Sequence, residues 1–350
     1  MNFRFTSSDL ALAATLLLGA TGAGAAPVGD AWQRPALSVK APARQALLSA
    51  AFAGARVVAV GERGLVALSD DRGITWRQAP SPVSVTLTTV RFADARRGVA
   101  VGHAGTVLTT EDAGESWTVR LDGLRLARLA KEAAATPEAM KEAERLLADG
   151  PDKPFLDVML WDAQRLLAVG AYGIAFHSQD GGKSWAPWMA RLPNPQGLHW
   201  YVARRAGDAI VLAGEQGLLA RSDDGGHSFR TLASPYKGSW FTGELRADGS
   251  LVLAGLRGNV WHARDGNSGW AQLSTPTGTS ITASATAADG TLLLANQAGL
   301  LLALRGETLV PVNERPLPMP AAVLPLAPDR ALAFGLAGAT PVALNLGAKP

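Results

Sequence analysis

Hydrophobic residues recur along this chain in short runs, and each run is followed by a glycine-containing turn and a second apolar run. One copy reads "RGVAVGHAGTVLTTED" and another reads "AIVLAGEQGLLARSDD". Apolar runs of four to eight residues, rich in Val and Leu and bounded by glycine, are typical of β-strands. Each copy therefore predicts two strands joined by a Gly-x-x-Gly turn.

This hairpin pattern occurs seven times. The first turn residues are Gly61, Gly102, Gly170, Gly214, Gly255, Asn296 and Gly335, so the spacings are 41, 68, 44, 41, 41 and 39 residues. A period of about 40 residues with several short strands per period is typical of a β-propeller. We predict an all-β, seven-bladed propeller over residues 26–350, with strands a to d in each blade.

An eight-residue motif, called the octet below, follows four of the hairpins. It reads "SDDRGITW", "TEDAGESW", "SQDGGKSW" and "SDDGGHSF", with a weaker fifth copy, "ARDGNSGW". Its Ser/Thr and Asp side chains can bind backbone N–H groups, its glycine permits the bend, and its aromatic residue can pack between blades. Because one motif recurs around a ring, we predict structural c–d turns and no active site. The residues concerned are Ser69, Asp71, Gly73, Trp76, Asp112, Gly114, Trp117, Asp180, Gly182, Trp185, Asp224, Gly226, Phe229, Asp265 and Trp270.

The two ends of the repeat region suggest how the ring closes. The last copy ends in "TPVALNLGAKP", which is a strand c with no strand d after it. Trp32 resembles the tryptophans that open strand d in other blades. Because a propeller must cover the edge between its first and last blades, we predict that residues 32–40 form a strand beside Val342–Leu346.

The long spacing between the second and third copies indicates an insertion of about 27 residues, within residues 121–154. Thr136 is suited to an N-cap, Pro137 to the first helical position and Gly150 to a helix stop. We predict a helical hairpin with helices over about 124–134 and 137–148. It is expected to act either as a lid on neighbouring blades or as a docking element.

The N-terminus has the pattern of a secretory signal peptide over residues 1–25. Arg4 supplies the positive start, residues 10–18 the apolar run and Ala23-Gly24-Ala25 the cleavage signal. That run is too short to cross a bilayer, so the mature protein is expected in the periplasm, or in the thylakoid lumen if the source is photosynthetic. The chain has no cysteine, which excludes disulfides and thiolate metal sites, and its formal net charge of +3 does not argue for nucleic acid.

The complete repeat, "VAVGxxGxxxxSxDxGxxW", resembles the Asp-box or BNR repeat of the photosystem II assembly and stability factor family, over about residues 30–347. The resemblance implies a non-enzymatic seven-bladed propeller without a cofactor. Photosynthetic members bind a precursor of a reaction-centre subunit during complex assembly, and similar exported propellers are thought to act beside membrane transport complexes. The implied partner is a membrane protein or membrane complex on the exported side.

In a propeller the b–c turns and d–a loops gather on one face, around the mouth of the central channel, and this face is the predicted binding surface. The candidate partner-binding residues are Glu62, Arg63, His103, Tyr172, Glu215, Gln216, Arg257, Trp200, Tyr236 and Trp240. Trp200 and Trp240 can alternatively pack in the core, in which case they would not anchor a partner.

The competing interpretation is a carbohydrate-active hydrolase of the sialidase type that uses the same mouth. Paired carboxylates across the mouth would be needed, and Glu62 and Glu215, three blades apart, are the only obvious pair. The five histidines show no metal-binding spacing. We therefore expect no catalytic residue and no metal site.

Overall fold

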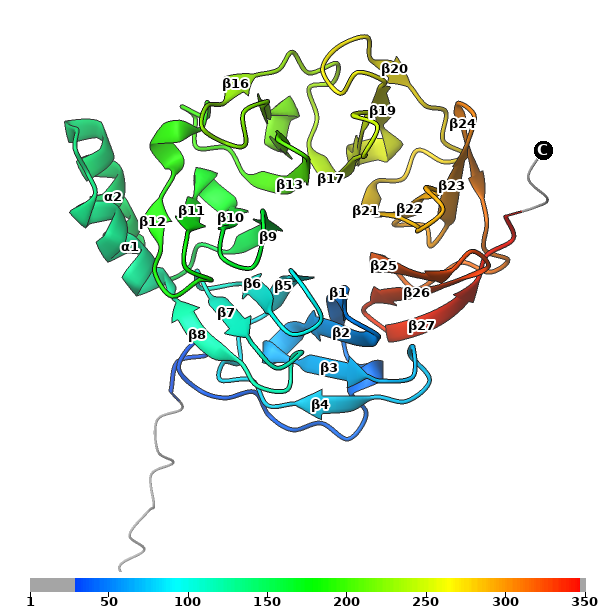
Figure 1. Ribbon diagram of the computed structural model, residues 1–350, viewed down its shortest axis with the longest axis horizontal. Coiled ribbons are helices and arrows are strands. Elements are labelled where there is room, and N and C mark those ends of the chain that lie inside the picture. The colour runs from blue at the N-terminus through cyan, green and yellow to red at the C-terminus, as the bar shows by residue number, and fades with distance from the viewer. Residues whose placement is uncertain (1–28, 347–350) are drawn as a thin grey trace, which may run out of the picture.

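The computed structural model describes residues 29–346, which form a ring of seven antiparallel sheets around a central channel (Figure 1). The seven-bladed propeller predicted from the repeat is confirmed. From the channel outward, the blades are β1 (Leu47–Ala53), β2 (Arg56–Gly61), β3 (Val66–Ser69) and β4 (Arg77–Ala79); β5 (Leu87–Phe92), β6 (Gly98–Gly102), β7 (Val107–Thr110) and β8 (Thr118–Leu121); β9 (Phe155–Leu160), β10 (Leu166–Gly170), β11 (Ala175–Ser178) and β12 (Ala186–Pro187); β13 (Trp200–Ala206), β14 (Ala209–Gly214), β15 (Leu219–Ser222) and β16 (Arg230–Thr231); β17 (Trp240–Leu245), β18 (Leu251–Gly255), β19 (Val260–Ala263) and β20 (Ala271–Gln272); β21 (Ile281–Thr286), β22 (Leu292–Asn296), β23 (Leu301–Arg305) and β24 (Thr308–Pro311); and β25 (Pro320–Ala327), β26 (Arg330–Gly335) and β27 (Gly338–Ala343).

The apolar core lies between neighbouring blades. The second strand of each blade is buried along nearly its whole length, because adjacent blades cover both of its faces. This explains why these strands read as continuous apolar runs without polar alternation.

In blades one to five the Gly-x-x-Gly turns are tight hairpin turns of type I′. In blade one, Leu65 N donates to Glu62 O at 3.1 Å, and Arg63 and Gly64 have φ of 55° and 74°. A Cβ on Gly64 would lie 1.9 Å from Val83 O, and a Cβ on Gly61 would lie 2.0 Å from Ala46 O. The first glycine is therefore needed for close backbone approach, and the second also for its left-handed conformation.

The four octets share one hydrogen-bond pattern, except that Phe229, which ends the fourth, has no indole N–H to donate. In blade two, Thr110 Oγ1 donates to Asp112 Oδ1 (2.7 Å) and accepts from Gly114 N (3.0 Å), while Ser116 Oγ donates to Asp112 Oδ2 (2.6 Å). Trp117 Nε1 donates to Gly114 O at 3.0 Å. A Cβ on Gly114 would meet Val58 and Leu68 of blade one at 3.3 Å. The side chains of the octet thus supply the hydrogen bonds of its own turn, and the turn packs closely against the preceding blade.

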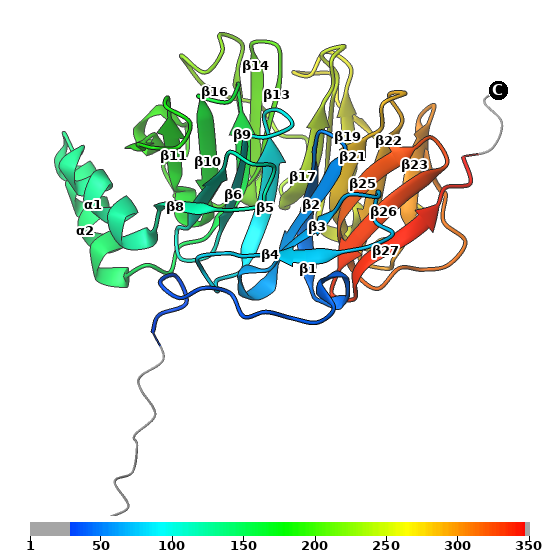
Figure 2. The ribbon, with the colours of Figure 1, turned by 60° about the horizontal axis from the view of Figure 1, so that its bottom comes forward.

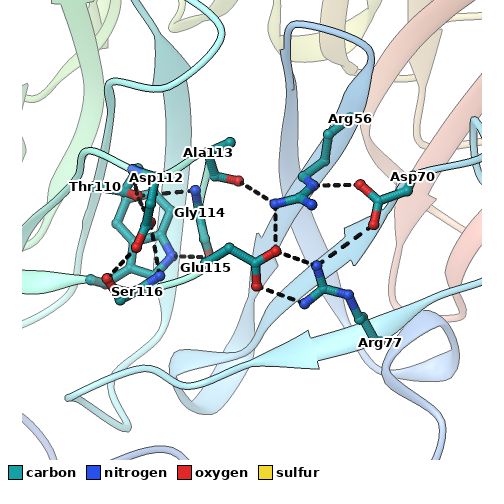
Figure 3. A network of polar contacts seen from close by, with 10 residues as sticks. Arg56, Asp70, Arg77, Thr110, Asp112, Ala113, Gly114, Glu115 and Ser116 are labelled. Carbon is teal, nitrogen blue, oxygen red and sulfur yellow. Dashed lines mark hydrogen bonds and ion pairs between the residues drawn. The ribbon is translucent and has the colours of Figure 1, made fainter.

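Charged side chains reinforce the joint between blades one and two (Figure 3). Arg77 forms two hydrogen bonds with the carboxylate of Glu115, at 2.5 and 2.9 Å, and Arg56 joins Glu115 (2.8 Å) to Asp70 (2.5 Å). Hydrogen bonding to Arg77 lowers the pKa of Glu115, and hydrogen bonding to Arg56 lowers the pKa of Asp70. Both acids therefore stay ionised, and the four charges tie blade one to the octet of blade two.

Replacing Ser178 with alanine should lower the free energy of unfolding by about 1–3 kcal/mol, because the buried N–H of Gly182 loses its acceptor. Ser178 is 1% exposed, and its Oγ accepts from Gly182 N at 2.8 Å. Urea denaturation measures the loss. Ser184→Ala is the control, because Ser184 lies at the exposed end of the same motif, where water can replace its hydroxyl. Equal losses for the two variants would contradict the explanation.

The prediction that residues 32–40 complete blade seven is wrong. Blade seven has three strands within residues 29–346, and β27 is its outermost strand. The N-terminal segment instead follows blade one: Ala36 N donates to Ser81 O (3.0 Å), and Val39 N donates to Gln78 Oε1 (2.8 Å). After β27 the chain turns to blade six, where Asn345 N donates to Val312 O (2.8 Å).

Ring closure therefore depends on apolar packing between blades seven and one. Leu332 and Phe334 of blade seven pack with Leu47 and Val57 of blade one, and Val39 contacts this cluster from the N-terminal segment. The 3₁₀ turn at Pro42–Arg44 also contacts β27.

Two helices, α1 (Gly123–Glu132) and α2 (Pro137–Asp149), stand outside the ring between β8 and β9 (Figures 1 and 2). Asp122 caps α1 by accepting from Leu124 N and Arg125 N, and Thr136 caps α2 by accepting from Ala139 N. Their apolar faces join the core between blades two and three. Within residues 29–346 no helix is long and apolar enough to cross a membrane. The predicted signal peptide lies outside the described residues.

Acidification from about pH 6.5 to 4 should destabilise the fold through His177, by up to about 3 kcal/mol. This imidazole is 8% exposed and stacks 4.5 Å from Trp188, and burial together with the positive charges of Arg191 and Arg165 lowers its pKa to about 4. In that window the unfolded chain binds a proton that the folded chain does not, so stability falls as the pH falls. Urea denaturation at pH 7 and 4.5 should show a smaller loss for His177→Phe. The same change at exposed His103 should leave the pH dependence as in the wild type.

Candidate binding site at the channel mouth

Each innermost strand has a β-bulge at its second residue. The strand register skips one residue between Leu47 and Ser49 in β1 and at the matching place in every other blade. A bulge re-aims a side chain, and all seven bulged residues line a cavity of about 170 Å³ in the channel. They are Leu48, Thr88, Leu156, Tyr201, Phe241, Thr282 and Ala321.

Four rings on blades three, four and five form a continuous row, called the aromatic strip below. Tyr172 lies 4.9 Å from His199, His199 lies 6.0 Å from Tyr201, and Tyr201 meets Phe241 edge-on at 5.5 Å, measured between ring centroids. Tyr172 is 44% exposed, and the other three rings are half-buried. The strip runs from the b–c turn of blade three to the channel, and partly exposed, rigid rings of this kind are suited to contact with a partner.

Two cations lie on the outer end of the strip. Lys153 Nζ is 4.6 Å and the guanidinium carbon of Arg145 is 5.9 Å from the centroid of Tyr172. Lys153 also contacts Asp152 (2.6 Å) and Asp149 (3.0 Å). Burial opposes the charged form of Lys153, yet hydrogen bonds to these two aspartates raise its pKa. The ammonium therefore remains charged under the ring.

Glu215 supplies a carboxylate beside the middle of the strip. Its Oε2 lies 2.9 Å from His199 Nδ1 and accepts from His199 N at 3.2 Å. Burial and the negative charge of Glu215 raise the pKa of Tyr201, so its hydroxyl stays protonated at neutral pH.

A buried charge network crosses the channel below the mouth. Asp157 of β9 binds Arg204 of β13 and lies 3.4 Å from Arg91 of β5, and it accepts from Ala203 N (3.1 Å) and Val158 N (2.9 Å). Beyond Arg204, Glu244 of β17 accepts from Ser284 Oγ at 2.8 Å. Five consecutive blades are joined in this way, and both carboxylates are engaged by protein groups.

Most of the predicted binding residues lie on the b–c and d–a face. Six of them are exposed there, namely Tyr172, Glu62, Arg63, His103, Gln216 and Arg257. Glu215 and Tyr236 are half-buried. Of these predicted residues, Tyr172 belongs to the aromatic strip and Glu215 contacts it through His199. Tyr236 packs edge-on against Trp240 at 5.3 Å and donates to Leu256 O, so it supports the blade.

Trp200 and Trp240 are wrong as surface candidates. Both are 0% exposed and lie in the core between blades. Successive strand residues point to opposite sides, so the residues that follow them, Tyr201 and Phe241, face the channel. Sequence reasoning missed these two residues, although the aromatic pairs Trp-Tyr and Trp-Phe at strand starts were a usable signal. It also did not group Lys153 with His199. These residues are distant in the sequence and come together only in the folded protein, where both contact Tyr172.

Within the described part of the chain, no three His, Asp or Glu side chains lie together so as to hold a metal ion.

Comparison with known proteins bears on the fold. No protein-family model and no curated protein sequence matches this chain. The solved structure of YCF48 bound to a D1 peptide aligns with a TM-score of 0.62 and 18% identity, covering 89% of this chain and 99% of that chain. YCF48 from Cyanidioschyzon merolae aligns with a TM-score of 0.63 and 14% identity over the same shares.

Propellers of another repeat class align almost as well. The WD40 β-propeller domain of Doa1 has a TM-score of 0.60 and 10% identity, covering 89% of this chain and 95% of that chain. At identities this low, similarity of structure shows the propeller fold alone.

Proposed function

We propose that this protein is an exported, non-enzymatic binding scaffold that holds a segment of a membrane protein or membrane complex at its channel mouth. It would act as an assembly or accessory factor for that complex. The aromatic strip carries the proposal, because four adjoining rings run from the periphery to the channel on the face where a propeller presents its variable loops.

Two further observations favour this proposal. The YCF48 structure that shares this fold was solved with a D1 peptide bound. Arg63 and Arg257 project from b–c turns, and within residues 29–346 their guanidinium groups have no hydrogen-bond or ion-pair partner. They are free to contact carboxylates of a bound segment.

The state of the channel carboxylates favours binding over glycoside hydrolysis. A hydrolase needs one free acid and one free base or nucleophile across the substrate. Asp157 is held by two arginines and two backbone N–H groups, and Glu244 is held by Ser284 and Thr286. Both carboxylates are thus occupied by protein groups, which favours a structural role for them.

Affinity capture from detergent-solubilised membranes of the source organism tests the proposal. Wild-type bait should recover a membrane protein that is lost with Tyr201→Ala/Phe241→Ala and weakened with Arg63→Glu/Arg257→Glu. Leu37→Ala/Ile74→Ala is the control, because these exposed apolar residues lie in the N-terminal segment and in an octet, away from the mouth. Equal recovery with all baits would refute the location of the site. A wild-type bait that recovers no membrane protein, together with glycan hydrolysis in a substrate screen, would favour the hydrolase.

A further inference from the structure

A residue near the end of the helical insertion, Lys153, contacts the outer ring of the aromatic strip. Lys153 lies two residues before β9, and its side chain is 6% exposed. Its ammonium lies 4.6 Å from the Tyr172 ring and within 3.0 Å of Asp149, the last residue of α2. A side chain this deeply buried presents little surface to a partner, and Tyr172 is the member of the aromatic strip that it contacts.

Tyr172 contacts neighbours outside its own turn. It occupies the first left-handed position of the b–c turn, with φ of 55°, and so do Arg63, Gln216 and Arg257 in other blades. Those three side chains are exposed. The Tyr172 side chain is also exposed, at 44%, but its ring lies against Lys153, Arg145 and His199, of which the first two belong to the insertion.

The insertion has little free apolar surface of its own. Leu126 of α1 and Leu146 of α2 are 1% and 2% exposed and pack with residues of blades two and three. A docking helix would be expected to keep an apolar face uncovered. On the channel-mouth face the insertion contacts Tyr172 through Arg145 and Lys153. It also contacts the b–c turn of blade two, where Gly123 N donates to Ala104 O (2.7 Å) and Lys153 O accepts from Gly105 N (2.8 Å).

We propose that Lys153 is a positioning residue that sets the orientation of Tyr172 and, through His199, that of Tyr201 at the channel. The helical hairpin is then part of the binding site, acting as the support of the aromatic strip. The consequence for partner binding rests on the proposed function, whereas the positioning itself does not. An ammonium held over a ring face by carboxylates provides the attraction, and the row of contacting rings provides the connection.

Fluorine NMR of the full chain labelled with 3-fluorotyrosine tests the positioning directly. The protein has three tyrosines, and Tyr236, packed on Trp240 in another blade, serves as an internal reference. Lys153→Met should shift or broaden the signals of Tyr172 and Tyr201 and leave that of Tyr236 in place. Lys141→Met, at an exposed position on α2, should change none of them. An unchanged Tyr172 signal, or a change confined to Tyr172, overturns the proposal.

Affinity for the membrane protein recovered by the wild type supplies the second measurement. Lys153→Met should weaken it about 2- to 30-fold, in the same direction as Tyr172→Ala, whereas Tyr172→Phe should retain it because the ring persists. Wild-type affinity for Lys153→Met beside weakened affinity for Tyr172→Ala would overturn the positioning role. If wild-type protein recovers no membrane protein, the proposed function fails, and the fluorine signals still decide whether Lys153 positions the strip.

Discussion

Asp157→Ala should lower the free energy of unfolding by about 3–5 kcal/mol, the typical cost of removing one partner from a buried ion pair. The side chain of Asp157 is 4% exposed and serves two arginines and two backbone N–H groups. Its removal leaves Arg204, whose side chain is 18% exposed, without its nearest counter-charge. Urea denaturation followed by tryptophan fluorescence measures the loss.

An exposed pair between neighbouring blades is the matched control. Arg264 and Glu307 lie 2.8 Å apart, with side chains 82% and 72% exposed. Glu307→Ala should therefore change stability by less than about 1 kcal/mol. Replacing Arg91, Asp157 and Arg204 together with leucine should recover part of the loss of the single variant. Similar losses for Asp157→Ala and Glu307→Ala would show that the channel network does not hold the blades together.

Trp200 and Tyr201 are neighbours in β13, but their replacement should affect different properties. Trp200→Ala should mainly lower stability, and Tyr201→Ala should mainly weaken partner binding. Trp200 is 0% exposed and is among the largest buried side chains, so its truncation should lower the free energy of unfolding by about 3–5 kcal/mol. Tyr201 faces the channel in the aromatic strip, so its truncation should weaken partner binding by about 2 kcal/mol or more, roughly 30-fold, as for a central interface residue.

The pair is informative because each variant controls for the other. Denaturation of both proteins, and binding measured at a temperature where both are folded, separate the two effects. Trp240→Ala and Phe241→Ala repeat the comparison in blade five, where Trp240 is also 0% exposed. If Tyr201→Ala binds as the wild type does, the strip is not the binding surface, and the arginines of the b–c turns become the main candidates.

Local chemistry in the sequence accounts for much of the fold. The period of about 40 residues was sufficient to predict seven blades, because each blade repeats the same order of strands and turns. Each octet satisfies its hydrogen bonds within eight residues, as Thr110, Asp112 and Ser116 do in blade two. Interactions of such short range can be recognised without knowledge of distant contacts.

The path of the N-terminal segment could not be predicted in this way. Its tryptophan resembled an octet aromatic residue, which suggested a strand in blade seven. The choice between blades was made by long-range contacts instead, namely Ser81 and Gln78 of blade one with Ala36 and Val39. The repeat pattern does not predict such contacts, because they depend on how two segments distant in the sequence pack together.

The sequence by itself determined the ring, its repeat and the face on which loops collect. Tertiary structure alone decided which side chains meet there: the bulges that aim Tyr201 and Phe241 into the channel, Lys153 beneath Tyr172, and Asp157 between two arginines. Blade geometry follows from local patterns repeated seven times. The candidate site is built from residues of neighbouring blades, which approach one another only when those blades have packed together.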